Sequence, residues 1–418
     1  MTTGTDSASQ EWRNGWPLVL AGAVGYSLFS IMANCVGAFM EPLGREFGFS
    51  RTLLSAGLPL AAMVNMLFAP FIGLFVDRRG ARGIALPGII ALALCICGFS
   101  FINGSPVQWF ALWTAYAFAA VLISVNVWSA AVAGAFSIGR GLALGAMLTG
   151  TAVAQAAIPP VATLLIDHFG WRTAFVWLGV GWGGVTFAIC YLCFMIARRS
   201  EASRAADAAP VVGHDLPGLT IREAWRDSGL QRIAVSTFLL LIVTIGLIIH
   251  QIPILTEAGV TREHAAWLAG LGGLAGIAGK IVTGWLMDRF RPNLVGGLTI
   301  AVVALAFLLL LDGVRTPVLI VIAMVINGYA AGCKVQICSY LTSRYGGLRN
   351  FGTIFGFMSS LIALGSAIGP VLAGKVYDMT GGYTPFLIGG GIACVICGLL
   401  IVTLPAYPDW GDKASGAR

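Results

Sequence analysis

The chain has 418 residues, of which 58% are hydrophobic and only 10% are charged, whereas about a quarter of the residues in a typical soluble domain are charged. This composition excludes an ordinary soluble globular protein and indicates a helical protein that crosses a membrane many times. The net charge of +7 does not by itself indicate nucleic-acid binding, because basic residues in membrane proteins mainly set the orientation of the loops.

The apolar stretches are separated by charged or Pro/Gly-rich breaks, and a bilayer core needs about 20 apolar residues per helix. They predict an all-α integral membrane protein with twelve transmembrane helices, at residues 16–40, 52–76, 83–102, 107–135, 141–166, 172–197, 232–256, 264–287, 294–311, 316–343, 351–375 and 383–404. The first stretch is too long for a signal-peptide core and has no small-residue cleavage site, so we expect it to be retained.

One long polar segment, residues 198–231, separates the sixth helix from the seventh. The predicted domains are therefore a cytoplasmic N-terminal tail (1–15), an N-terminal six-helix bundle (16–197), a cytoplasmic linker (198–231) with a short amphipathic helix near 219–228, a C-terminal six-helix bundle (232–404) and a cytoplasmic tail (405–418). If the N-terminus is cytoplasmic, 17 of the 25 Lys and Arg residues lie on that side and six on the other. This bias predicts that both termini are cytoplasmic.

An internal repeat relates the two halves at a single offset of 211 residues. It maps Asp77 onto Asp288 and Pro159 onto Pro370, and it also maps Pro42, Glu46, Gly73, Arg78, Gly145 and Gly170 onto Pro253, Glu257, Gly284, Arg289, Gly356 and Gly381. Six helices return the chain to its starting side, so the halves have the same orientation, as in parallel repeats related by an axis along the membrane normal.

The sequence GLFVDRRGAR at 73–82 joins the second and third predicted helices, and GWLMDRF at 284–290 is its weaker second copy. A glycine allows helices to approach closely, an aspartate accepts hydrogen bonds from helix N-terminal amides, and arginines suit the adjacent helix end. The candidate residues of this loop motif are Gly73, Asp77, Arg78, Arg82, Gly284, Asp288 and Arg289. Together with twelve helices, the motif resembles the loop signature of the major facilitator superfamily, which implies two six-helix bundles around a central cavity.

Further stretches are similar to the monocarboxylate-porter branch, which includes bacterial oxalate/formate exchanger-like carriers. They are PLGREFGFSR at 42–51, RGLALG at 140–145, FGWR at 169–172, HQIPILTEAGVT at 250–261 and GKIVTGWLMDR at 279–289. The resemblance implies that a cation on the eighth helix, usually an arginine, binds the substrate carboxylate, and Lys280 occupies that place. Lysine retains the charge but lacks the bidentate guanidinium. Gly276 stands where the branch often has an aspartate, so proton coupling through that side chain is excluded.

Lys280 and Lys334 fall inside predicted spans, whereas none of the 18 acidic residues falls in a span interior. Charged groups at such depth are costly and usually face the bundle interior or a watery cavity. We therefore predict that a small carboxylate substrate is the missing counter-ion and that both lysines bind it. Alternatively, each lysine extends its ammonium group to the membrane–water interface. A third possibility is that one of the lysines is uncharged.

The remaining candidates are polar or aromatic residues within spans. His250 is the only histidine in the interior of a predicted span and is a candidate proton carrier, substrate ligand or structural histidine. The uncharged candidates also serve in many proteins as contacts between helices; they are Tyr26, Asn34, Asn126, Gln155 and Tyr329, with Trp128 as a possible packing surface. Asn34 and Asn126 rank first, because the resemblance implies that helices one, four, seven and ten line the cavity.

The leading functional hypothesis is a secondary active transporter of small organic anions, namely monocarboxylates with aromatic acids as one option, coupled to protons. Dicarboxylate or organic anion exchange is the main alternative, since a second lysine favours a dianion. A drug/proton antiporter is disfavoured because the fourth helix has no basic residue, and a sensor or scaffold because the linker and tail are short. No catalytic residue, cofactor or metal site is predicted, because both Cys-x-x-Cys pairs lie in apolar helices without His or carboxylate partners. We expect a monomer in a bacterial inner membrane.

Overall fold

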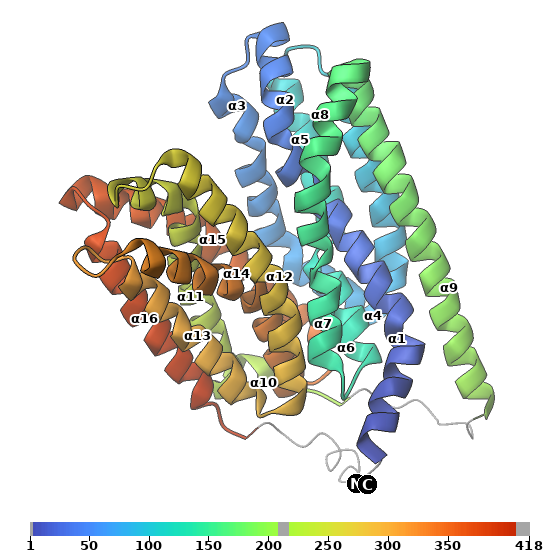
Figure 1. The fold of residues 1–418 in the computed structure, drawn as a ribbon. Helices are drawn as coiled ribbons and strands as arrows, with labels where there is room; N and C mark the ends of the chain where they lie inside the picture. Colours follow the sequence, from blue (N-terminus) through green and yellow to red (C-terminus); the bar gives the residue numbers. More distant parts are fainter. Residues whose placement is uncertain (1–2, 208–216, 407–418) are drawn as a thin grey trace. The chain divides into compact units, whose positions relative to one another are not determined.

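The computed structural model describes residues 3–207 and 217–406, and this part of the chain is built from helices without named strands (Figure 1). Residues 208–216 of the predicted linker and residues 407–418 of the predicted C-terminal tail lie outside the described residues.

Residues 3–207, the described part of the first half, contain nine α-helices. They are α1 (Thr3–Phe29), α2 (Ile31–Phe47), α3 (Arg51–Ser55), α4 (Gly57–Gly98), α5 (Pro106–Val121), α6 (Val125–Ala135), α7 (Arg140–Leu148), α8 (Gly150–Val176) and α9 (Gly183–Asp207). A short 3₁₀ turn follows α4 at Phe99–Phe101, and a π-helical turn at Trp177–Trp182 joins α8 to α9.

The second half begins with the short helix expected near residues 219–228, which is α10 (Ile221–Arg226) and starts with a capping box formed by Thr220 and Glu223. Between α10 and residue 406, where the described part of the chain ends, lie six long helices. They are α11 (Ser228–Glu257), α12 (Arg262–Arg289), α13 (Pro292–Leu309), α14 (Pro317–Gly346), α15 (Phe351–Thr380) and α16 (Thr384–Val402).

Among the described residues, ten helical ranges are long and apolar enough to cross a membrane. Two of them, Leu53–Phe101 with 49 residues and Arg140–Ala197 with 58 residues, are each long enough for two crossings. Both are interrupted by a glycine with positive φ, Gly80 at 73° and Gly170 at 76°, a conformation that glycine adopts without steric cost. The ten ranges therefore supply the twelve predicted membrane-spanning segments.

Several helix ends and breaks differ from the sequence-based prediction. α1 begins at Thr3 and α9 continues to Asp207, although spans were expected from residue 16 and up to residue 197. A hydrophobicity pattern predicts only the part of a helix that lies in the bilayer. Polar residues can continue the same helix beyond the bilayer. The first predicted span is broken at Ser30, where the hydroxyl groups of Ser27 and Ser30 donate to the carbonyls of Val24 and Ser27 and compete with the helix backbone.

The chain forms two compact units, and each contains most of one half of the sequence plus a short segment from the other half. The first unit comprises Met1–Ile138, Ala146–Leu216 and Asn350–Ser360, and the second comprises Gly139–Gly145, Pro217–Arg349 and Leu361–Arg418. The segment 139–145 and the start of 350–360 differ by the same 211 residues as the sequence repeat. Each half of the sequence therefore contributes a segment, at equivalent positions of the repeat, to the unit formed mainly by the other half.

The two units have different cores. In the first, Phe99 lies against Trp109, Trp113 and Phe175, with ring centroids 5.5–5.6 Å apart. In the second, glycines bring α12 and α14 into direct backbone contact.

A Cβ atom added to Gly332 on α14 would lie 1.9 Å from the carbonyl oxygen of Gly276 on α12, and one added to Gly328 would lie 2.1 Å from that of Gly272. Only glycine fits at such contacts. These two helices carry Lys280 and Lys334, so the glycine contacts determine where both lysines lie.

Candidate functional site

Asp77 of the loop motif binds the N-terminus of α15 within the first unit. Its carboxylate accepts hydrogen bonds from the backbone N–H of Gly352 at 2.7 Å, the backbone N–H of Thr353 at 2.8 Å and the Thr353 hydroxyl at 2.7 Å. The N-terminus of a helix attracts negative charge because its first amides have no partners within the helix. Gly73 permits this approach, since a Cβ atom there would lie 2.0 Å from the carbonyl oxygen of Gly352.

Asp288 makes the equivalent interaction within the second unit. Its carboxylate accepts from the backbone N–H groups of Gly141 at 2.7 Å and Leu142 at 2.8 Å, at the start of α7. A Cβ atom on Gly284 would lie 2.5 Å from the carbonyl oxygen of Gly141. The partners of Asp288, like Asp288 itself, are displaced by 211 residues from those of Asp77, so the repeat conserves the interaction as well as the residue types.

The arginines of the motif take different positions. Arg78 is exposed, Arg82 approaches the sulfur of Met195 at 3.8 Å, and the guanidinium of Arg289 lies 5.3 Å from the ring centroid of Trp285. The aspartates therefore make the specific contacts of the motif, while the arginines lie at the helix ends.

Lys280 is half-buried on α12, in the part of this helix that packs against α14. A Cβ atom on the preceding Gly279 would lie 2.3 Å from the carbonyl oxygen of Tyr329. One turn further along α12, the hydroxyl groups of Thr283 and Tyr329 are hydrogen-bonded at 2.8 Å. The structure thus brings Tyr329 close to the segment around Lys280. Both residues were predicted from the sequence to bind substrate.

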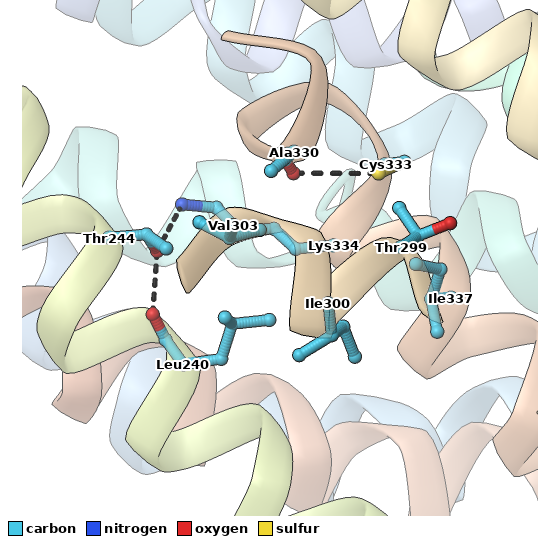
Figure 2. Close-up of a pocket in the computed structure, with 9 residues that line it drawn as sticks. All are labelled: Leu240, Thr244, Thr299, Ile300, Val303, Ala330, Cys333, Lys334 and Ile337. Carbon is cyan, nitrogen blue, oxygen red and sulfur yellow. Dashed lines mark hydrogen bonds between the residues drawn. The ribbon is translucent and has the colours of Figure 1, made fainter. Parts of the chain in front are cut away.

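Lys334 lies inside the second unit with 7% of its surface exposed. Its Nζ donates to Thr244 Oγ1 at 3.1 Å, and Thr244 Oγ1 donates to the carbonyl of Leu240 at 2.6 Å (Figure 2). The pocket around it has no space large enough for a water molecule, and its other lining residues are Thr299, Ile300, Val303, Ala330, Cys333 and Ile337. The lining includes no acidic residue and not Lys280, so the two lysines do not share this pocket.

His250, on α11, is held by residues of the same unit. One ring nitrogen, Nδ1, lies 2.8 Å from the hydroxyl of Tyr383, and Nε2 lies 3.1 Å from the carbonyl oxygen of Pro370 on α15. The side chain is half-buried, and both nitrogens have partners within the protein. A substrate would have to replace one of these partners to bind His250 directly.

Asn126 and Asn34 follow helix breaks in the first unit. Asn126 is fully buried: its Nδ2 donates to the carbonyl of Ala69 at 3.4 Å, and its Oδ1 accepts from the hydroxyl of Ser359. Asn34 is half-buried, and its Nδ2 donates to the carbonyl of Ser30 at 2.9 Å. In this conformation Asn126 connects helices, whereas Asn34 supports the break between α1 and α2.

The other candidates of the first unit are scattered. Tyr26 is half-buried and stacks on Phe29, with ring centroids 5.4 Å apart. Gln155 is exposed on α8. Trp128 is fully buried, donates to the carbonyl of Ile123 at 3.0 Å and so presents no surface to a ligand in this structure.

The neutral partners of these candidates were not predicted from the sequence. Thr244 binds Lys334, Thr283 binds Tyr329, Tyr383 binds His250, and Thr353 and Ser359 bind Asp77 and Asn126. The available signal was a hydroxyl residue within or beside an apolar span, but this signal is common because such residues join helices in many membrane proteins.

Comparison with known proteins identifies the family. The model of the major facilitator superfamily matches two overlapping stretches of the chain, residues 22–333 and 233–417. The chain belongs to the major facilitator superfamily. Among its relatives are monocarboxylate transporter 12-B of Danio rerio and monocarboxylate transporter 4 of Rattus norvegicus.

Both relatives are 24% identical to this chain; the alignments cover 93% and 96% of it, and 87% and 84% of the relatives. The solved structure of the human organic anion transporter MFSD10 is similar in fold, with a TM-score of 0.69 at 17% identity over 94% of this chain and 99% of that chain. The twelve-segment, two-repeat architecture and the suspected family are thereby confirmed, and the protein is a multi-pass membrane protein of a transporter family.

Proposed function

We propose that this protein is a secondary active transporter of small monocarboxylates, driven by proton symport through alternating access. Lys280 is the observation that carries the proposal: it places a cation on α12 at the position where the monocarboxylate-porter pattern has its carboxylate-binding residue. The similarity to proteins named monocarboxylate transporters supports the substrate class. Tyr329, Tyr26, Asn34 and Gln155 remain proposed substrate contacts.

Uptake by purified protein in liposomes tests this proposal directly. A panel of radiolabelled mono- and dicarboxylates, including aromatic acids, is offered with and without an inward proton gradient. We expect saturable monocarboxylate uptake that the gradient accelerates. Uptake of organic cations in place of carboxylates would refute the proposal, because a fixed cation in the site repels them.

The loop motif is proposed to act in the conformational step of transport. Asp77→Asn replaces one carboxylate oxygen with an NH₂ group. This group donates and cannot accept a hydrogen bond, so one of the hydrogen bonds from the N–H groups of Gly352 and Thr353 is lost. We expect the maximal uptake rate to fall by about tenfold with a smaller change in the Michaelis constant, since a contact that controls opening and closing acts on turnover. Kinetics of labelled substrate uptake measure both quantities.

Asp167→Asn is the matched control, because Asp167 is an exposed aspartate on α8. It should leave both constants unchanged. An unaltered maximal rate for Asp77→Asn, at equal protein levels, would show that the loop is only a turn.

Lys334 distinguishes monocarboxylate symport from dicarboxylate exchange. Its contact with Thr244 and its enclosure by α11, α13 and α14 favour a role within the second unit. We therefore expect Lys334→Met to change mono- and dicarboxylate transport equally and to preserve folding, because replacement of a buried ion by an apolar residue of similar size is often tolerated. Competition of unlabelled succinate against a labelled monocarboxylate measures the difference, and selective loss of the dianion would support exchange.

The orientation is proposed from the distribution of basic residues, with both termini in the cytoplasm of a bacterial cell. Single cysteines introduced into the segments 198–207 and 219–227 should react with a membrane-impermeant maleimide only in inverted vesicles. Labelling in right-side-out vesicles would reverse the orientation.

A further inference from the structure

His250 connects three parts of the second unit. It belongs to α11, its Nε2 faces the carbonyl of Pro370 on α15 at 3.1 Å, and its Nδ1 faces the hydroxyl of Tyr383, just before α16, at 2.8 Å. The ring is half-buried while Tyr383 is only 7% exposed. The histidine is thus held at a junction of helices rather than pointing freely into solvent.

The two partners differ in what they can do chemically. A carbonyl oxygen only accepts, so Nε2 carries a hydrogen and donates to Pro370 in every protonation state. A hydroxyl both donates and accepts. Tyr383 therefore donates to Nδ1 when the imidazole is neutral and accepts from Nδ1–H when it is charged. His250 can gain and lose a proton without losing either hydrogen bond, which a backbone amide at the position of Tyr383 would not permit.

Tyr383 lies next to side chains that reach the surface. Its ring packs against that of Tyr377 with centroids 4.7 Å apart, and the Tyr377 hydroxyl interacts with the carboxylate of Glu257, which is exposed at the end of α11. A tyrosine hydroxyl is protonated near neutral pH, since its ordinary pKa is about 10, and it is therefore available as a donor.

The other charged groups in this region are positioned differently. Arg315 is paired with Asp312 at 2.6 Å and also donates to the backbone carbonyl of Glu257 at 3.2 Å. Lys375 and Asp378 are exposed on α15. Among the described residues that the structure places against the imidazole itself, Tyr383 is thus the one with a titratable side chain.

We propose that His250 takes up and releases the coupled proton of transport and that Tyr383 relays it. The inference rests on the proposed proton symport and names its proton carrier. In the loading step the Tyr383 hydroxyl gives its proton to Nδ1 and receives one from the side of Tyr377 and Glu257, so one proton enters and the imidazole becomes imidazolium. Release follows the reverse order. This role is separate from binding of the substrate carboxylate, which is assigned to Lys280.

The test compares two modes of transport in the same liposomes. Counterflow exchange needs substrate on both sides but no net proton movement, whereas accumulation against a concentration gradient needs the proton gradient. His250→Gln keeps a donor for Pro370 and an acceptor for Tyr383 but cannot carry a proton. We expect counterflow within about twofold of the wild type and loss of about tenfold or more in proton-driven accumulation, as for removal of a proton-transferring group.

Two further variants complete the experiment. Tyr383→Phe removes the relay hydroxyl and should reduce proton-driven accumulation while His250 is present. His264→Gln is the matched control, because His264 is an exposed histidine on α12 of the same unit, and it should change neither mode.

The outcomes separate this inference from the proposed function. Unchanged proton-driven accumulation in His250→Gln overturns the inference and leaves monocarboxylate transport intact. Equal loss of both modes overturns it as well, because it assigns His250 to substrate binding or structure. Wild-type protein that takes up no monocarboxylate in either mode refutes the proposed function itself, and wild-type uptake that ignores the proton gradient refutes symport and the inference together.

Discussion

Replacement of Lys280 by glutamine is expected to reduce monocarboxylate uptake by about thirtyfold or more, since loss of one charged contact to a desolvated ligand costs about 2–5 kcal/mol and about 1.4 kcal/mol corresponds to a factor of ten. The folded state should persist, because Lys280 is half-buried at the α12–α14 contact and the glycine packing around it does not depend on its ammonium group. Initial rates in proteoliposomes measure the first effect, and thermal unfolding in detergent measures the second.

Two substitutions control this experiment. Lys280→Arg keeps the charge and restores the group usual in the monocarboxylate-porter pattern, so it should retain substantial uptake. Lys375→Gln removes an exposed lysine on α15 and should have no effect. Wild-type uptake by Lys280→Gln would eliminate Lys280 as the carboxylate ligand and remove the main support for an anion carrier.

The second large effect is expected at the contact between the two helices that carry the lysines. In Gly332→Ala the new Cβ would lie 1.9 Å from the carbonyl oxygen of Gly276 and 2.6 Å from its carbonyl carbon. These are backbone atoms, so α12 and α14 must separate to admit the methyl group. Overpacking of this kind costs about 1–3 kcal/mol, and we expect a lower midpoint of thermal unfolding together with reduced uptake, because Lys280 moves with α12.

Gly273→Ala is the matched control on α12, since no heavy atom lies within 4 Å of a Cβ atom built at Gly273. Alanine is the better helix former by about 1 kcal/mol, so this variant should be as stable as the wild type or more so. If Gly332→Ala unfolds at the same temperature as Gly273→Ala, the close approach of α12 to α14 does not stabilise the protein.

Several features could be predicted because their causes are local or repeat along the chain. Apolar stretches of membrane length predicted the spans, and the 211-residue offset predicted two related halves. Gly80 and Gly170, where the structure breaks two long helical ranges, fall between predicted spans. The breaks at Ser30 and between α5 and α6 were not predicted, since a hydrophobicity pattern does not register a local change of backbone hydrogen bonding.

The sequence by itself determined which residues are unusual for a membrane interior: Lys280, Lys334 and His250 stand out because a charged or titratable group is costly in hydrocarbon. Only the tertiary structure decided what each of them faces. Hydropathy predicts how deep in the membrane a residue lies, but not whether its side chain faces the inside or the outside of the helix bundle. The contact of Lys334 with Thr244, for example, joins residues 90 positions apart. Likewise Asp77 was recognisable as a helix-end acceptor, but its partner amide, that of Gly352, lies 275 residues later in the chain. Such partners are selected by the packing of helices distant in sequence, so they emerge only when the whole bundle is assembled.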